Sequence, residues 1–405
     1  MANTLLTINM ITREAVRLWK NTNAFMRNMS TSYDDQYART GAKIGSQLRI
    51  RLPVDFTVRT GAAASFQDVS EQFTTLTMAT QQGVDMSFPS IDLTLSVDDF
   101  AERYIAPAVN NLAGTVAANI MSGSEGGVCN YVDNESGGVI ITPSSTTFLT
   151  ANAILDTQSA PTMNHRVVVN PFTDARVAGA LTGLFNPVPE ISEQYRSGGM
   201  KNALGLDWMK DQTVIMHTNG SFSAGTVSGA GQSGTTITTG AITGTLNKGD
   251  IITIANVNGV NRVFKASYGQ LRQFVVTSNV ASGGTSIPIY PALIASSNGV
   301  AGGPQQQYQT VDSTPANGAA ITLQGPASAV FRKNIAFTPE MVTMATADLE
   351  IPPDVQSARH EFDGVSMRMV RQYIVGTDQT GTRLDIVYGF LYVRPEWGVV
   401  IPDIQ

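Results

Sequence analysis

Residues 96–122 read SVDDFAERYIAPAVNNLAGTVAANIMS, and this stretch decides the predicted fold. Ser96 and Asp99 form a capping-box pattern, which is typical of a helix start. Pro107 lacks an amide hydrogen, so the stretch predicts a short helix ending near Ile105 and a second helix with Pro107 in its first turn. The second helix, the spine helix, would be about 25 Å long. An ordinary core helix fits equally well. The predicted core positions of the spine recur mostly at steps of four residues: Phe100, Tyr104, Leu112, Val116 and Ile120.

On the N-terminal side, residues 46–91 change to strand periodicity. Apolar and polar residues alternate over 48–52, and again over 73–78 and 84–88. Residues 59–68 between these runs are not periodic. We therefore expect a long β-hairpin with a flexible end. Because an isolated two-stranded hairpin is at best marginally stable in water, it must rest on another surface, supplied by a second copy of the chain if not by its own domain.

On the C-terminal side, residues 147–218 alternate short helices and strands, which predicts a second α/β layer. The composition then changes. Residues 219–329 are rich in Gly, Ser, Thr, Asn and Ala and contain short β runs spaced by about ten to fifteen residues, a pattern typical of a small β-barrel or sandwich. The predicted core of this region consists of apolar strand positions: Ile252, Ile254, Val263, Phe264, Phe274 and Val276.

After residue 330 the earlier pattern resumes, so one domain is interrupted by an insertion and closes at its C-terminus. Two long strands are predicted over residues 365–375 and 382–393, joined by a polar turn, with a last short strand at 397–401. A length of 405 residues suits two or three domains.

Charged residues make up 14% of the chain, against roughly 25% in an average globular protein. This shortage fits a protein that buries much of its surface against partners, although it also fits a β-rich secreted protein. The net charge of −6 does not support global attraction to nucleic acid. Residues 1–50 differ, because seven basic and three acidic side chains give them a net charge of +4. Residues 4–20 of this part are predicted as an amphipathic helix, and a solvated helix face would also explain the charge.

Cys129 is the only cysteine, so an intramolecular disulfide is impossible and a cytosolic folding compartment is expected. No apolar run approaches the roughly 18 residues of a membrane span, and the N-terminus lacks the pattern of a signal peptide.

The sequence contains no phosphate-binding loop, nucleophile elbow or metal-binding motif. His165, His217 and His360 are far apart in sequence, and each is interpreted as a hydrogen-bonded structural residue. We therefore predict no catalytic, cofactor-binding or metal site, and no enzyme activity.

The order of these elements resembles the major capsid proteins of tailed phages, which have the Hong Kong ninety-seven fold. Within that group it is similar to the coat proteins of short-tailed Salmonella phages, which carry an insertion domain. The resemblance spans nearly the whole chain, and it depends on the order of the segments more than on any single motif. The segments that carry it are residues 11–18, 45–53, 100–118, 246–254, 273–277, 334–337 and 385–396.

The resemblance implies an α+β capsid fold with an inserted all-β barrel domain. The implied parts are an N-arm (1–45), an extended β-hairpin loop (46–91), a peripheral domain with the spine helix (92–149 and 361–394), an axial domain (150–218, 330–360 and 395–405) and the inserted domain (219–329). Some relatives crosslink a lysine to an asparagine between subunits. This chain has no lysine between Lys43 and Lys201, so such a crosslink in the extended loop is not expected.

The implied function is structural: self-assembly of hexamers and pentamers into an icosahedral shell that encloses phage DNA. Scaffolding, portal and decoration proteins are further expected partners, the location is the virion after assembly in the bacterial cytoplasm, and no membrane is involved. A β-rich adhesin or glycan-binding protein is the alternative. Candidate contacts between subunits are charged residues of the hairpin: Arg49, Arg51, Arg59, Asp68 and Glu71. The candidate basic arm facing the shell interior contains Arg13, Arg17 and Lys20.

Overall fold

The computed structural model divides the chain into two compact units, which are described separately. The first contains Met1–Ile50, Thr74–Ile120 and Val342–Val393, and the second contains Arg51–Phe73, Met121–Met341 and Arg394–Gln405. The described residues are 23–31, 47–64, 71–89, 104–180, 202–296, 306–362 and 365–405, with Phe66 and six positions between 12 and 19. None of the helices in these parts is long and apolar enough to cross a membrane.

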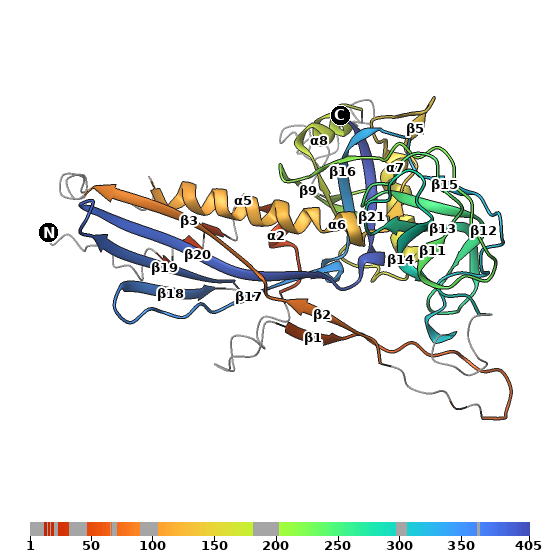
Figure 1. The fold of residues 1–405 in the computed structure, drawn as a ribbon, viewed down its shortest axis with the longest axis horizontal. Coiled ribbons are helices and arrows are strands. Elements are labelled where there is room, and N and C mark those ends of the chain that lie inside the picture. Colours follow the sequence, from red (N-terminus) through yellow and green to blue (C-terminus); the bar gives the residue numbers. More distant parts are fainter. Residues whose placement is uncertain are drawn as a thin grey trace, which may run out of the picture. The chain divides into compact units, whose positions relative to one another are not determined.

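The first unit is built on a long antiparallel sheet in the order β17-β20-β19-β18, and β3 pairs with the free side of β20 (Figure 1). The strands are β3 (Thr80–Pro89), β17 (Val342–Ala347), β18 (Gln356–Phe362), β19 (Val365–Ile374) and β20 (Gln379–Tyr392). The two strands predicted near the C-terminus, with their polar turn, are β19 and β20. The sheet also includes residues 342–360, which the sequence had placed with the axial part. Strands β17 and β18 thus belong to the same sheet as β19 and β20.

The spine helix lies along this sheet as α5 (Ala106–Ser122) (Figure 1). It begins one residue before Pro107, as the missing amide hydrogen predicts. The side chain of Asn119 donates a hydrogen bond to the Tyr388 hydroxyl at 2.6 Å, and the Tyr392 hydroxyl donates to the Ile120 carbonyl at 2.8 Å. These bonds join the helix to β20.

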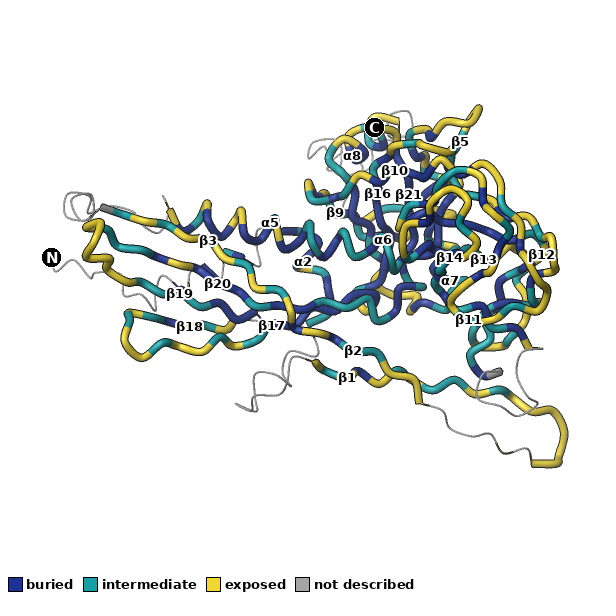
Figure 2. The backbone as a smooth tube through the Cα atoms, viewed as in Figure 1, coloured by how far each residue is buried: buried dark blue, intermediate teal, exposed yellow. Residues whose placement is uncertain are grey.

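Burial along α5 is one-sided (Figure 2), and Leu112, Val116 and Ile120 are all buried. Tyr104 differs from the prediction: it is 43% exposed, and its ring lies 5.0 Å from that of Phe88 in β3. Its position at the start of the helix leaves it at the edge of the core. Phe100 and the predicted capping box lie outside the described residues.

The predicted long hairpin is shorter in the structure. Within residues 46–91, β1 (Gln47–Arg51) pairs with β2 (Phe73–Thr77) in a two-stranded sheet. The third predicted strand, β3, instead pairs with β20 over its whole length, from Thr80 opposite Tyr388 to Pro89 opposite Gln379. The sequence therefore placed the end of the hairpin about fourteen residues too late, because alternation identifies a strand but not its partner.

The second unit contains a sheet in the order β4-β21-β16-β7-β9-β8, with β10 also paired to β16. The strands are β4 (Asn130–Tyr131), β7 (Arg166–Val169), β8 (Asn202–Ala203), β9 (Leu206–Lys210), β10 (Met216–Thr218), β16 (Val330–Phe337) and β21 (Gly398–Ile404). Its helices are α6 (Ser124–Gly127), α7 (Ser145–Thr157) and α8 (Pro171–Ala180), near the predicted positions of the last two. Phe148 of α7 packs on Trp208 with ring centroids 4.4 Å apart, inside a core of Val, Leu and Ala.

The remaining described elements of the two units are α2 (Ala24–Arg27), β5 (Glu135–Ser136), β6 (Val139–Ile140), η4 (Gln306–Tyr308), η5 (Pro339–Met341) and η6 (Pro395–Trp397).

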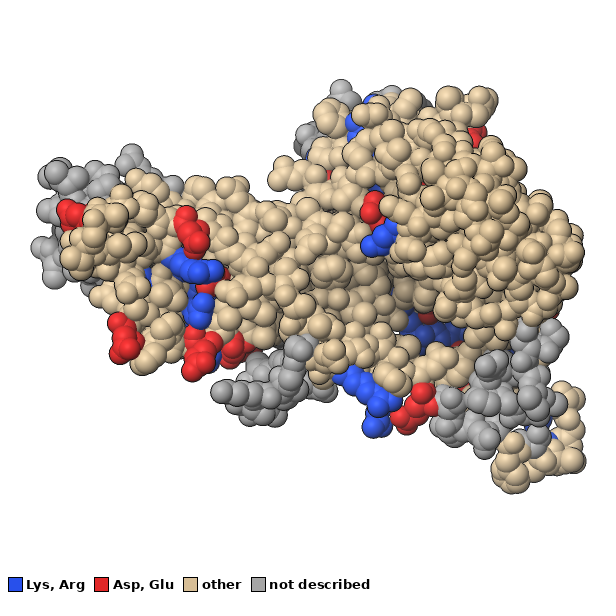
Figure 3. Space-filling view, in the orientation of Figure 1, with Lys and Arg blue, Asp and Glu red and all other residues tan. Residues whose placement is uncertain are grey.

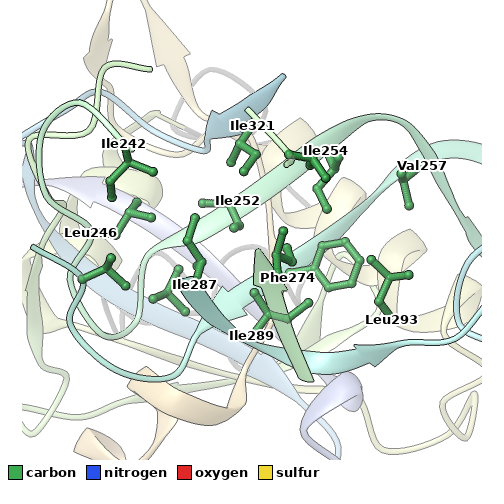
Figure 4. Close-up of a cluster of buried hydrophobic side chains, with 14 of the residues drawn as sticks. Ile242, Leu246, Ile252, Ile254, Val257, Phe274, Ile287, Ile289, Leu293 and Ile321 are labelled. Carbon is green, nitrogen blue, oxygen red and sulfur yellow. The ribbon is translucent and has the colours of Figure 1, made fainter. Parts of the chain in front are cut away.

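A second sheet of this unit, in the order β11-β14-β13-β12-β15, lies entirely within residues 219–329. Its strands are β11 (Gly234–Thr238), β12 (Ile251–Val260), β13 (Ser267–Val276), β14 (Ser286–Leu293) and β15 (Ile321–Leu323). They enclose a hydrophobic core around Phe274, Ile252 and Ile254, and every member of this core comes from the same region (Figure 4). The two ends of the region meet: the Asn219 amide donates to the Ala329 carbonyl at 2.9 Å.

Two of the predicted core residues of this region are wrong. The sequence predicts Val263 and Phe264 in a buried strand. In the structure they lie in the turn between β12 and β13, and their side chains are 68% and 67% exposed. The turn closes because the Asn261 amide donates to the Ala266 carbonyl, and the Asn261 side chain accepts from the amides of both residues. The strand β14 was not predicted; it contains two prolines, which weaken a strand pattern.

Candidate functional site

An apolar surface lies on the segment between β1 and β2. We call residues 51–73 the arm. Four of its large apolar side chains are exposed: Phe56 by 56%, Val58 by 93%, Phe66 by 94% and Phe73 by 52%. Described residues 52–64 and Phe66 form no helix or strand, so Phe56, Val58 and Phe66 are not on the outer face of a sheet, whereas Phe73 begins β2. Several large apolar groups on one extended segment are typical of a surface that binds another protein.

Charged residues of the arm partly pair with each other. Arg51 and Glu71 form an ion pair at 3.5 Å, with their side chains 75% and 52% exposed. An exposed pair of this kind contributes little stability. The Arg59 guanidinium donates to the carbonyl of Gly61, and Arg49 is exposed on β1. Asp68, the other predicted contact, lies outside the described residues. The structure therefore brings together two of the five predicted residues, within one chain.

The arm is bound to the rest of its unit by a group of charges near its start. Asp55 accepts from Arg262 Nε at 2.7 Å and lies 3.8 Å from Lys265 Nζ, and Arg262 Nη1 lies 3.3 Å from Glu396. We call Asp55, Arg262, Lys265 and Glu396 the arm-root junction. Burial lowers the pKa of Arg262, but the hydrogen bond and charge of Asp55 outweigh it and leave that pKa raised. No local pattern in the sequence indicates this junction, because Asp55, the turn that carries Arg262 and Lys265, and Glu396 lie more than 100 residues from one another.

A cavity of about 380 Å³ lies beside the arm-root junction. Its apolar lining consists of Pro53, Val54 and Phe56 of the arm with Val263 and Trp397. The Arg394 guanidinium lies over the Trp397 ring at 5.6 Å. This lining continues the exposed apolar surface of the arm onto the turn between β12 and β13.

A buried cluster of titratable groups lies elsewhere in the same unit. His217 Nε2 lies 3.0 Å from Asp250 Oδ1, and its Nδ1 lies 3.3 Å from Glu125 Oε1. Lys333 is buried nearby, and burial lowers the pKa of its amine to about 8. Since His217 and Asp250 are both fully enclosed, the cluster offers no approach to a substrate. His165 Nδ1 donates a hydrogen bond to Asn152 Oδ1 at 2.5 Å. These contacts fit the structural role predicted for both histidines.

The basic N-terminal arm predicted from the sequence, with Arg13, Arg17 and Lys20, is described only in part. Arg13 is exposed on a helical stretch whose Ala15, Val16 and Trp19 are buried, as an amphipathic helix requires. Arg17 and Lys20 lie outside the described residues. On the face drawn in Figure 3, most of the described surface is uncharged, and Lys and Arg stand mainly next to Asp and Glu. In the part of the chain that is described, no three metal-ligating side chains come together.

Comparison with known proteins gives one family. Residues 231–402 match the family described as "P22 coat protein - gene protein 5". No curated protein matches the chain.

Solved structures that are similar include one of "Mycobacterium phage Che8" (13% identity, 94% of this chain and 90% of that chain covered, TM-score 0.49). Another is the "Capsid of Ralstonia phage GP4" (8% identity, 95% and 91% covered, TM-score 0.46). A third is the "CUS-3 coat protein I-domain" (28% identity, 25% of this chain and 94% of that chain covered, TM-score 0.21).

Residues 231–402, less than half of the chain, thus match a family of structural coat proteins, which are not enzymes. This match supports the tailed-phage major capsid protein of the Hong Kong ninety-seven type that the order of the segments predicts. A place in the virion and self-association into a shell agree with the match over residues 231–402. The alternative of an adhesin or glycan-binding protein is not supported by the match.

Proposed function

We propose that the arm joins neighbouring copies of this capsid protein in an icosahedral shell of hexamers and pentamers around phage DNA. The observation that carries the proposal is the set of exposed apolar side chains on the arm, above all Val58 and Phe66. A side chain of this size contributes about 1.5–3 kcal/mol when it is fully buried. Since each shell contains many copies of the contact, a small loss per contact has a large effect on assembly.

The test is a double variant, Val58→Asp with Phe66→Asp, examined by electron microscopy and analytical ultracentrifugation of the purified protein. We expect the unassembled subunit to fold as the wild type does, because neither side chain is buried within the chain. Losing roughly 3 kcal/mol per contact would weaken association by about a hundredfold. The matched control is Met163→Asp, at a residue that is 78% exposed in the same unit outside the arm. Wild-type shell yield from the double variant would refute the role of the arm.

The charges of the hairpin are proposed to set the register of this contact more than its affinity. Arg51→Glu breaks the ion pair with Glu71 within the chain, whereas Arg59→Glu leaves it intact. If register matters, each substitution lowers shell yield, and adding Glu71→Arg to Arg51→Glu does not restore the yield. Restoration by this swap would show that the pair acts only within one chain.

The parts predicted from the sequence are proposed as the domains of this protein, with two changes of boundary. Residues 342–360 are proposed to belong to the peripheral domain, and residues 121–149 to the axial domain. Residues 219–329 are proposed as the inserted β domain. Their own five-stranded sheet, their own core and the meeting of their two ends support this.

Scaffolding, portal and decoration proteins are proposed partners, and assembly is proposed to take place in the bacterial cytoplasm. The basic N-terminal arm is proposed to face the interior, where it meets DNA or a scaffolding protein. Replacing Arg13, Arg17 and Lys20 by Gln is expected to weaken DNA retention or scaffold binding, and more so at low salt than at high salt. A salt-independent defect would indicate lost helix packing instead.

A further inference from the structure

The arm-root junction consists of charges from three segments that are distant in sequence. Arg262 lies between two carboxylates, 2.7 Å from Asp55 and 3.3 Å from Glu396. Lys265 approaches Asp55 from the same turn at 3.8 Å, and its amine is buried without a hydrogen-bond partner. The exposed fractions of these side chains are all below one-third, so water and salt screen the junction less than they screen a surface pair.

The receiving side of the junction is held by contacts that do not involve the arm. The turn at 261–266 is closed by its own backbone hydrogen bonds, and the Asn261 side chain donates to the Thr157 carbonyl at the end of α7. Glu396 is held by Arg394 at 3.4 Å and by the Tyr290 hydroxyl at 3.2 Å. Arg262 and Lys265 are therefore supported by contacts that do not depend on the arm.

The arm needs such a contact because the ladder of hydrogen bonds between β1 and β2 ends at the start of the arm. The Leu52 amide donates to the Gln72 carbonyl at 2.9 Å, and Pro53, which has no amide hydrogen, follows. Residues 53–64 form no helix or strand, so the ladder cannot fix the direction of the chain there. Asp55 lies three residues past the last ladder bond. Its contact with Arg262 therefore acts where the ladder no longer fixes the direction of the arm.

We infer that the arm-root junction sets the direction in which the arm leaves the subunit, and that the turn between β12 and β13 is thereby a positioning element for assembly. The inference rests on the proposed function, in which the arm reaches a neighbouring copy. A direction fixed within the free subunit removes ordering cost from each association step. Asp55 and Arg262 act through the arm and do not themselves need to touch the neighbour.

The test is Asp55→Asn, which keeps the shape of the side chain, removes its charge and keeps every trypsin site. In the unassembled subunit, we expect trypsin to cleave after Arg59 about tenfold faster, because proteolysis follows the population of the open form. In assembly, we expect misshapen or open shells in place of closed ones. Asp55→Glu, which keeps the charge, should restore both properties. Asp354→Asn, at an exposed aspartate of the first unit, is the matched control.

Arg262→Gln tests the same ion pair from the other side and must give the same increase in cleavage after Arg59. Cleavage and shell shape unchanged in both variants would overturn the inference. If Asp55→Asn assembles normally while Val58→Asp with Phe66→Asp does not, the junction has no positioning role and the proposed function stands. If the apolar double variant assembles normally, the proposed function fails, whereas faster cleavage in Asp55→Asn still shows that the junction holds the arm.

Discussion

Gly83 in β3 tests the strand pairing that the sequence did not reveal. It lies opposite Asp385 of β20, a carboxylate that is completely buried and bound by Arg368 Nη2 at 2.7 Å and Arg383 Nε at 2.8 Å. A Cβ at position 83 would overlap the Asp385 carboxylate and lie 2.7 Å from the Leu384 carbonyl oxygen. The carbonyl belongs to the paired strand and cannot rotate away, and the carboxylate is held by two arginines.

Gly83→Ala is therefore expected to destabilise the first unit. Overpacking costs about 1–3 kcal/mol, and disturbing a buried ion pair costs about 3–5 kcal/mol when one partner is lost outright. Since Ala displaces the carboxylate without removing it, we expect a cost of about 3 kcal/mol. The free energy of local opening should fall by that amount, which corresponds to about a hundredfold faster amide exchange in β3 and β20.

The assay is hydrogen exchange of the unassembled subunit, read on peptides from β3 and β20. Gly114→Ala is the control, because an added Cβ there meets nothing within 4 Å. This substitution lies within α5 and should stabilise the helix by about 0.5–1 kcal/mol, since Gly has a low helix propensity. Exchange in Gly83→Ala that matches the wild type would refute the pairing of β3 with β20 in this register.

The remaining predictions concern burial and titration. Leu112→Ala should lower the unfolding free energy of the first unit by about 2–5 kcal/mol, measured by urea denaturation. The unfolding free energy should rise as the pH increases from about 8 to 10.5, because over that range the unfolded Lys333 still binds a proton that the folded one has lost; Lys333→Met should flatten this rise. Cys129 is buried and its pKa is raised to about 11 by burial, so its thiol should react with thiol reagents at pH 8 only after unfolding. Residues 219–329 expressed alone should show a β-type circular dichroism spectrum and a cooperative thermal transition, and a disordered fragment would contradict their proposed independence.

Local patterns carried most of what the sequence predicted. The spine helix follows from spacing and one proline, and β11, β12 and β13 follow from short apolar runs between turn residues. Each of these signals lies within about fifteen residues. The pairing of β3 with β20 joins residues about 300 positions apart, and no periodicity of either strand specifies its partner.

The errors at the candidate site have two origins, a local turn and a contact between distant segments. Val263 and Phe264 are apolar and were placed in a core, but Lys265 adopts a positive φ of 55° and the turn leaves them exposed. Asn261, a residue that favours turns, was the available signal. The junction of Asp55 with Arg262 could not be found from sequence, because it depends on where two distant segments lie after folding.

The meeting of β10 and β16 has a consequence for the order of folding. Thr218 pairs with Val330, so the two strands form a hairpin whose connection is about 110 residues long. Closing a flexible loop of that length costs about 4 kcal/mol of chain entropy, roughly 3 kcal/mol more than a four-residue turn. If residues 219–329 fold first, their paired ends already hold the two strands together, and most of that entropy has been lost before the strands meet. A ribosome delivers the whole intervening segment before β16, so the direction of synthesis favours the faster route.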